Sequence, residues 1–367
     1  MSLNPWSILL FIPLMLVTTL STTIAATATP HPLIPTQLKT ASSWQEMPLP
    51  QKISYQGDQL ALRPDGRVVA EGDNRAIRLW KLAEGTTLCT VASFPELPGE
   101  SQMGAIAFSP DGKTLAASVY LPEQQTFLIK LWDAKSGREL HTLRSRLVPK
   151  VFDRNSDGSP RYRSDSNIIF SPDGKRLVGV VGNHSTVQVW DWASGKVTQT
   201  FVGGDGTAIA FSQDGRLLGR GGESAIYLWD VQSRRRLQRF SSPYPLGNFV
   251  FNSNTTLLYS TSKAAPGNTD QSIQVWNVKT GQPTRRFGIG NWSSQVGLSP
   301  DGKTVAIGGP SSSLAFVDLM QPQVVTRTDN VFPSWSNLMA FDRTGSIFVL
   351  ANRSEVRLWQ HRPHSTR

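Results

Sequence analysis

The sequence predicts an all-β protein assembled from repeated units, and three observations support this class. Only 17% of the 367 residues are charged, whereas 30 are Gly and 24 are Pro, as expected for many short strands joined by tight turns. Large apolar residues are plentiful and 11 Trp are spread along the chain, which disfavours disorder. The third observation is a pair of short motifs that recurs seven times. An all-β unit of this length can be a single domain.

The amino terminus has the features of a signal peptide. Ile8 to Val17 is apolar and uncharged, and Ala26-Thr27-Ala28 matches the small-x-small pattern of signal peptidase sites. The apolar core is shorter than the about 20 residues of a membrane-spanning helix. We therefore predict export to the periplasm or the medium, with residues 1–28 as signal peptide and 29–43 as a Pro/Thr-rich spacer. An uncleaved membrane anchor over Trp6 to Ala26 is the alternative.

Two motifs define the repeat. The first reads apolar-x-apolar-Ser-Pro-Asp-Gly or a variant of it, and its seven copies begin at Leu60, Ile106, Ile168, Ile209, Phe249, Val296 and Leu338. The second is an alternating apolar and polar segment that ends at Trp80, Trp132, Trp190, Trp229, Trp276 or Trp359, and it is replaced by Leu314 to Asp318 in the sixth unit. Alternation predicts strands with one exposed face, and Pro-Asp-Gly predicts a tight turn between two of them.

These motifs resemble those of the WD-repeat family, and the resemblance covers about Gln45 to Gln360. It implies a seven-bladed β-propeller of four-stranded blades over residues 44–360, with a tail at 361–367. The six motif Trp residues are then expected to be buried anchors. Because only eight residues follow Trp359, we expect the segment that contains Trp44 to supply the outer strand of the last blade. With the predicted export, the chain is expected to be a divergent, bacterial-type exported member of the WD-repeat family.

Two features of the family pattern are missing. Gly-His pairs are absent, and of the positions six before the motif Trp only Asp270 keeps the family's Asp. The buried Asp–His–Ser/Thr–Trp hydrogen-bond network of the family is therefore expected to be missing. We expect apolar packing around the anchor Trp residues to hold the blades together.

Insertions and spare aromatics fall on one predicted face. The turns within Pro-Asp-Gly and after the anchor Trp are short, whereas the loops between blades and between middle strands, such as Val119 to Thr126, are long. Long loops on a rigid scaffold are where binding usually occurs. We therefore predict that a partner binds this loop-rich face; the alternative is that the aromatics only pack the loops. The predicted partner-binding residues are Trp335, Trp292, Phe332, Tyr162 and Arg163.

Little in the sequence indicates catalysis or a cofactor. The five His residues are scattered, and the inner strands carry no recurrent acid that would favour a propeller hydrolase or lactonase. Asp153, Asn155 and Asp157 have the spacing of a calcium loop, but Ser164 stands where the bidentate acid belongs. We predict a non-enzymatic protein without a cofactor. A Ca²⁺-dependent adhesive module that uses residues 153–158 and a propeller hydrolase remain the alternatives.

Charge suggests the partners. The net charge of +10 and the run Arg234 to Arg236 with Arg239 favour anionic surroundings, such as an envelope polymer or a lipid surface. A solvated basic face is the alternative. Nucleic acid is disfavoured by the predicted export. The family resemblance implies a scaffold for protein partners, and we expect a monomer. Cys89, the single cysteine, excludes an internal disulfide.

Overall fold

The computed structural model describes the repeat region and leaves residues 1–43 out. The described residues are 44–49, 59–73, 75–93, 102–121, 124, 126–145, 153–154, 160–161, 167–181, 186–203, 206, 208–221, 225–241, 246–253, 256–261, 271–290, 296–308, 314–319, 323–328, 338–351 and 355–362. The predicted signal peptide and spacer lie outside this part of the chain and stay predictions. No helix with the length and hydrophobicity of a membrane span occurs among the described residues.

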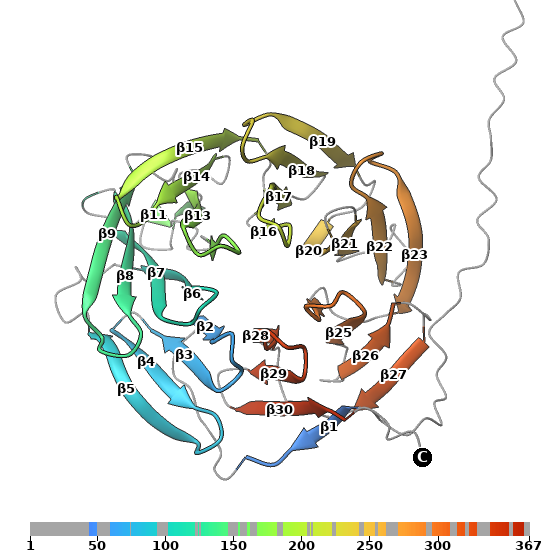
Figure 1. Cartoon of the computed structure of the whole chain (residues 1–367), viewed down its shortest axis with the longest axis horizontal. Helices are drawn as coiled ribbons and strands as arrows, with labels where there is room; N and C mark the ends of the chain where they lie inside the picture. Colours follow the sequence, from blue (N-terminus) through green and yellow to red (C-terminus); the bar gives the residue numbers. More distant parts are fainter. Residues whose placement is uncertain are drawn as a thin grey trace, which may run out of the picture. The chain divides into compact units, whose positions relative to one another are not determined.

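The described strands form seven four-stranded sheets, which we call blades 1 to 7 (Figure 1). Blade 1 contains β2 (Gln59–Leu62), β3 (Val68–Gly72), β4 (Ala76–Lys81) and β5 (Thr86–Ser93). Blade 2 contains β6 (Gln102–Phe108), β7 (Thr114–Leu121), β8 (Thr126–Asp133) and β9 (Glu139–Ser145). Blade 3 contains β12 (Ile168–Phe170), β13 (Arg176–Val181), β14 (Thr186–Asp191) and β15 (Lys196–Val202). Blade 4 contains β16 (Ile209–Phe211), β17 (Leu217–Gly221), β18 (Ala225–Asp230) and β19 (Arg236–Ser241).

Blade 5 contains β20 (Leu246–Ser253), β21 (Thr256–Thr261), β22 (Gln271–Asn277) and β23 (Pro283–Gly290). Blade 6 contains β24 (Val296–Leu298), β25 (Thr304–Gly308), β26 (Leu314–Asp318) and β27 (Gln323–Thr328). Blade 7 contains β28 (Leu338–Phe341), β29 (Ile347–Ala351), β30 (Val356–His361) and β1 (Trp44–Met47). A small hairpin of β10 (Asp153–Arg154) and β11 (Pro160–Arg161) follows blade 2.

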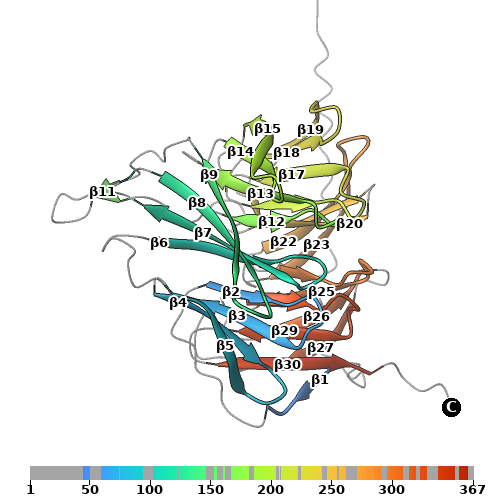
Figure 2. The ribbon, with the colours of Figure 1, turned by 60° about the vertical axis from the view of Figure 1, so that its left-hand side comes forward.

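The inner strands close into a ring. β2 contacts β6, and contacts then run in order through β12, β16, β20, β24 and β28, which contacts β2 again. Figure 2 shows the successive sheets side by side around this ring. The prediction of an all-β propeller with four-stranded blades is confirmed.

An amino-terminal strand completes blade 7, as predicted. β1 pairs antiparallel with β30, from Trp44 opposite His361 to Met47 opposite Leu358. The outer strand of this blade therefore comes from the opposite end of the described chain from the other three. The pairing also covers the backbone edge that β30 would otherwise expose.

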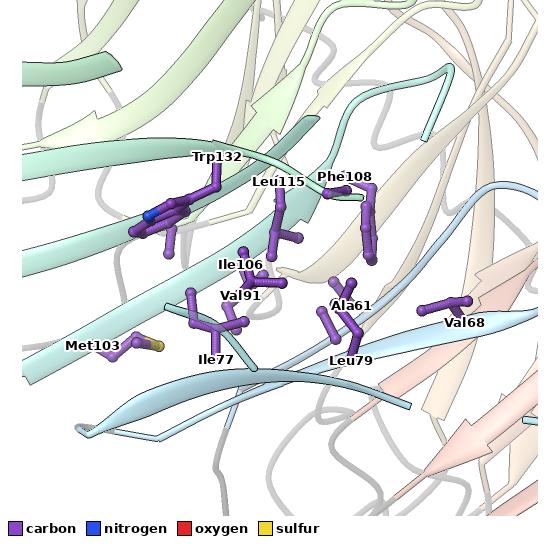
Figure 3. Packing of buried hydrophobic residues seen from close by; sticks show 13 residues of the cluster. Ala61, Val68, Ile77, Leu79, Val91, Met103, Ile106, Phe108, Leu115 and Trp132 are labelled. Atoms are coloured by element: carbon purple, nitrogen blue, oxygen red, sulfur yellow. The ribbon is translucent and has the colours of Figure 1, made fainter. Parts of the chain in front are cut away.

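The core consists of apolar layers between neighbouring blades. Figure 3 shows the layer between blades 1 and 2, where Ile77 and Leu79 of β4 face Ile106 of β6 and Trp132 of β8. Five anchor Trp residues are buried, and they are Trp132, Trp190, Trp229, Trp276 and Trp359. Trp80 is only half-buried, and its indole N–H donates to the Glu71 carboxylate at 2.8 Å. A buried carboxylate on the neighbouring strand β3 therefore accepts the indole hydrogen bond of the anchor Trp in blade 1.

The short turns depend on Ser and Asp in addition to Gly. In blade 2 the Ser109 hydroxyl donates to Asp111 Oδ1 at 2.6 Å and accepts the Thr114 backbone N–H at 2.9 Å, while Gly112 adopts a φ of +71°. Blade 4 makes the same Ser212–Asp214 bond although its motif has Gln in place of Pro. Pro is therefore dispensable in this turn.

One predicted loop is shorter than expected. Val119 to Thr126 was expected to form a long loop on the loop-rich face. Instead β7 continues to Leu121 and β8 begins at Thr126, because Val119, Tyr120 and Leu121 are buried and extend the sheet.

Candidate interaction surfaces

The residues that the sequence proposes for binding lie largely outside the described part of the chain. This holds for Trp335, Trp292, Phe332, Tyr162 and Arg163, and for Asn155 and Asp157 of the proposed calcium loop. Asp153 is described only as a backbone position in β10, opposite Arg161. No group of three or more His, Cys, Asp or Glu residues able to hold a metal ion occurs in the described ranges. The loop-rich face and the calcium loop therefore stay predictions.

The short-turn face carries a cavity of about 700 Å³ between blades 2 and 3. We define this face by the Ser-Pro-Asp-Gly turns and the turns after the anchor Trp. Both kinds of turn line the cavity, and Arg343 reaches it from the equivalent turn of blade 7. The lining side chains that matter below are Pro110, Asp111, Lys113, Pro172, Asp173, Lys175, Asp191, Trp192 and Arg343.

A second cavity of about 540 Å³ lies between blades 1 and 2. Asp111 and Lys113 border both cavities, so the two form one band across three blades. Cys89 lines the second cavity and packs against the layer between blades 1 and 2. Burial raises the pKa of its thiol, which lowers the fraction of thiolate at neutral pH.

The acidic side chains of the band are held by their own turns. Burial raises the pKa of Asp111, but hydrogen bonds from the Ser109 hydroxyl and the Lys113 backbone N–H outweigh it, so that the pKa lies below its ordinary value. Asp173 is held in the same way by Ser171 and by the Lys175 backbone N–H. These carboxylates are ionised at neutral pH and directed towards the protein backbone.

The basic side chains of the band are available to a ligand. Lys113, Lys175 and Arg343 are exposed, and none of them forms an ion pair with another described residue. Their charges therefore face solvent at the rim of the cavity. Such a rim attracts the carboxylates of a partner and adds to the rate of association.

Trp192 supplies an apolar wall of the cavity between blades 2 and 3. Its indole N–H donates to the Gly174 carbonyl at 2.8 Å. Its ring lies edge-on to Phe170, with centroids 6.5 Å apart, and to His141 at 5.9 Å. The ring is thus fixed before any partner arrives, which lowers the entropic cost of binding. Sequence reasoning missed Trp192, although it is the only Trp that directly follows a Trp-Asp pair.

Together the closed ring of four-stranded sheets, the Ser-Asp-Gly turns and the anchor Trp residues define a β-propeller whose repeat is similar to that of WD-repeat proteins. No family model matches the chain. It is similar to a serine-threonine kinase receptor-associated protein of Dictyostelium discoideum, 24% identical over 57% of this chain and 78% of the relative. A pre-mRNA-processing factor 19 homolog of Arabidopsis thaliana is 36% identical over 20% of this chain and 14% of its own length.

A third relative carries the repeat in its name. An uncharacterized WD repeat-containing protein of Synechocystis sp. is 40% identical over 52 residues, which are 14% of this chain and 15% of the relative. The matched segment therefore spans less than a sixth of this relative and of the Arabidopsis one. The similarity supports the type of repeat. The activities of these relatives are not assigned to this chain.

Proposed function

We propose that this protein is a non-enzymatic interaction scaffold that binds one protein partner on the loop-rich face of the propeller and makes a second contact through the short-turn face. The structural observation that supports the second contact is the band of two adjoining cavities on the short-turn face. Its carboxylates are engaged by their own turns, whereas Lys113, Lys175 and Arg343 are free of ion pairs beside a fixed Trp192. This pattern of an aromatic anchor with a charged rim is typical of protein-binding surfaces.

The loop-rich face is the proposed surface for the first partner. Its support comes from the sequence alone, through the long inter-blade loops and the aromatics Trp335, Trp292 and Phe332 with Tyr162 and Arg163. Exposed aromatics and Arg contribute much of the binding energy at interfaces. We retain this face as the site of the first partner, because its insertions distinguish this chain from a minimal propeller, and assign the short-turn band to a second contact.

The test is partner capture from the native envelope fraction with matched variants. Trp335→Ala with Trp292→Ala should abolish capture of a partner held by the loop-rich face and leave the thermal unfolding curve unchanged. Lys113→Glu with Lys175→Glu tests the short-turn band in the same way. Arg285→Glu, a charge reversal at an exposed position on the outer strand β23, is the control. If all variants capture the same proteins as the parent, the scaffold proposal is wrong.

Export and contact with an anionic envelope surface complete the proposal. The apolar segment Ile8 to Val17 and the site at Ala28 support export, and the net charge of +10 supports attraction to anionic polymers or lipids. Metal analysis of the purified protein separates the scaffold from a Ca²⁺-dependent adhesive module. Stoichiometric calcium that is lost in the Asp153→Asn, Asp157→Asn variant would favour the adhesive module.

A further inference from the structure

The outer strand of blade 4 carries four exposed arginines without ion-pair partners. Arg234 and Arg235 lie in the turn before β19, and Arg236 and Arg239 lie on it. None of the four guanidinium groups forms an ion pair with a described residue. Asp230, the carboxylate at the start of the turn, is held by Arg216 at 2.9 Å and by the Ser233 backbone N–H at 2.7 Å. The positive charge of this strand is therefore uncompensated locally.

The turn before β19 is strained in a way that its counterparts are not. Arg234 has a φ of +61° and is the single non-glycine residue with positive φ in the described ranges. The same turn position holds Gly85, Gly137, Gly195 and Gly281 in blades 1, 2, 3 and 5, all with φ between 65° and 71°. A side chain in this conformation is costly, and no described hydrogen bond or ion pair of the Arg234 side chain offsets the cost. The strained position adds one more exposed guanidinium group beside β19.

Two of the four arginines are fixed in place by one aromatic ring. The guanidinium carbons of Arg236 and Arg239 each lie 5.8 Å from the centroid of the Tyr227 ring. Tyr227 itself stacks on the buried Trp229, with centroids 6.1 Å apart. Cation–π contact, together with the 3.4 Å hydrogen bond from Arg239 Nε to the Tyr227 hydroxyl, holds both cations in place, and both residues are exposed to solvent. Pre-organised guanidinium groups suit bidentate binding of carboxylates.

Apolar side chains lie beside these cations. Of the four exposed large hydrophobic residues among those described, Leu237 is on β19, and Val197 and Val202 are on β15 of blade 3. The Gln199 side chain donates to the Val231 carbonyl at 2.6 Å, which joins β15 to the turn of blade 4. β19 is also the last strand of its sheet, so its outer backbone edge is open to a further strand (Figure 1).

We propose that the basic edge, defined as Arg234, Arg235, Arg236 and Arg239, binds an extended acidic polypeptide segment that also carries apolar residues. This surface begins in the turn after Trp229, at the border of the short-turn face, and continues along the outer strand β19, away from the two cavities described above. The proposal rests on the proposed scaffold function and names the chemistry of a further partner. Carboxylates pair with the arginines, apolar side chains cover Leu237, and the backbone pairs along β19. A lipid surface would use the charges and leave the backbone edge unused.

The test is fluorescence anisotropy with a labelled peptide of about 12 residues that alternates Glu and Val. The parent protein should bind it, and binding should weaken as salt is raised. Arg235→Gln, Arg236→Gln, Arg239→Gln should weaken the affinity by about tenfold or more. Arg138→Gln is the matched control, because Arg138 is exposed at the position of blade 2 that Arg235 occupies in blade 4, and it should bind as the parent does.

The Arg234→Gly variant removes both the backbone strain and the guanidinium charge at this position, and the two losses are measured separately, by stability and by peptide binding. It should raise the melting temperature by about 1–3 °C and at the same time weaken peptide binding. Equal binding by the parent and the triple variant would overturn the proposal, as would binding to phosphatidylserine vesicles without binding to the peptide. Capture through the two faces does not depend on these arginines, so the scaffold proposal can survive that result.

Discussion

The Trp44 indole stacks on the Phe316 ring, with centroids 4.5 Å apart and planes inclined by 5°. Trp44 belongs to β1 of blade 7 and Phe316 to β26 of blade 6. Phe316 also meets Phe348 edge-on at 5.1 Å, within a cluster that includes Leu314 and Trp359. The amino-terminal strand therefore does more than complete a sheet, because it anchors the closing blade to its neighbour.

Trp44→Ala should destabilise the protein by about 3–5 kcal/mol, the usual cost of removing a buried Trp. Urea unfolding measures the change, and size-exclusion chromatography detects association through an opened edge. Glu46→Ala is the control on the same strand. Glu46 is exposed and pairs with Arg357 at 3.4 Å, so its loss should cost less than about 1 kcal/mol. Equal unfolding midpoints for the two variants would contradict the anchoring role.

Asp230 should make stability depend on acid pH. Its pKa is lowered from 3.8 to about 2, chiefly by the Ser233 backbone N–H and then by Arg216. Because the folded-state pKa is depressed, the stabilisation is complete above about pH 4 and is lost as the pH falls towards 2. The melting temperatures of the parent and Asp230→Asn should differ at pH 6 and converge by about pH 2. A difference that stays constant over this range would contradict the assignment.

Glu71 should be required for the stability of blade 1. It is 1% exposed and accepts the Trp80 indole N–H at 2.8 Å. Glu71→Ala leaves that donor without its acceptor, which should cost about 1–3 kcal/mol. Glu71→Gln keeps an acceptor and should lose less. Thermal unfolding of the two variants gives the comparison, and the interpretation fails if Gln is as damaging as Ala.

The mature amino terminus should begin at Thr29. The small-x-small pattern that ends at Ala28 predicts cleavage there after export. Amino-terminal sequencing of the protein from its native source measures this directly. An intact Met1 on a membrane-bound protein would point to the uncleaved anchor instead, and an intact Met1 on a soluble protein would contradict export.

Much of the fold could be predicted from the sequence, because each blade repeats the same local signals. The Trp motif marks the third strand, and Asp-Gly marks the turn before the second. The shortage of residues after Trp359 was enough to assign Trp44 to blade 7. The Ser–Asp hydrogen bond in the turns was missed, because Pro is the more conspicuous residue there. Glu71 was missed since the acid of the family pattern was sought in the turn six residues before Trp80, whereas Glu71 lies on the strand before that turn.

The candidate surfaces were harder to predict. Aromatics in long loops drew attention to the loop-rich face, whereas the cavity beside Trp192 forms only when the turns of blades 2 and 3 come together. No single repeat contains that cavity. The strain at Arg234 could have been found by aligning the turns that follow each anchor Trp, since a Gly column is interrupted there.

The pairing of β1 with β30 constrains how the chain can be made. Glu46 and Arg357, which pair across these strands, are 311 residues apart in the sequence. During synthesis β1 is made before the other described strands. Its partner strand β30 is made last, so the two can pair only when nearly the whole propeller has been synthesised. Contacts this distant form late and carry a large entropic cost. Until β30 has been made, β1 therefore has no partner strand and the ring cannot close.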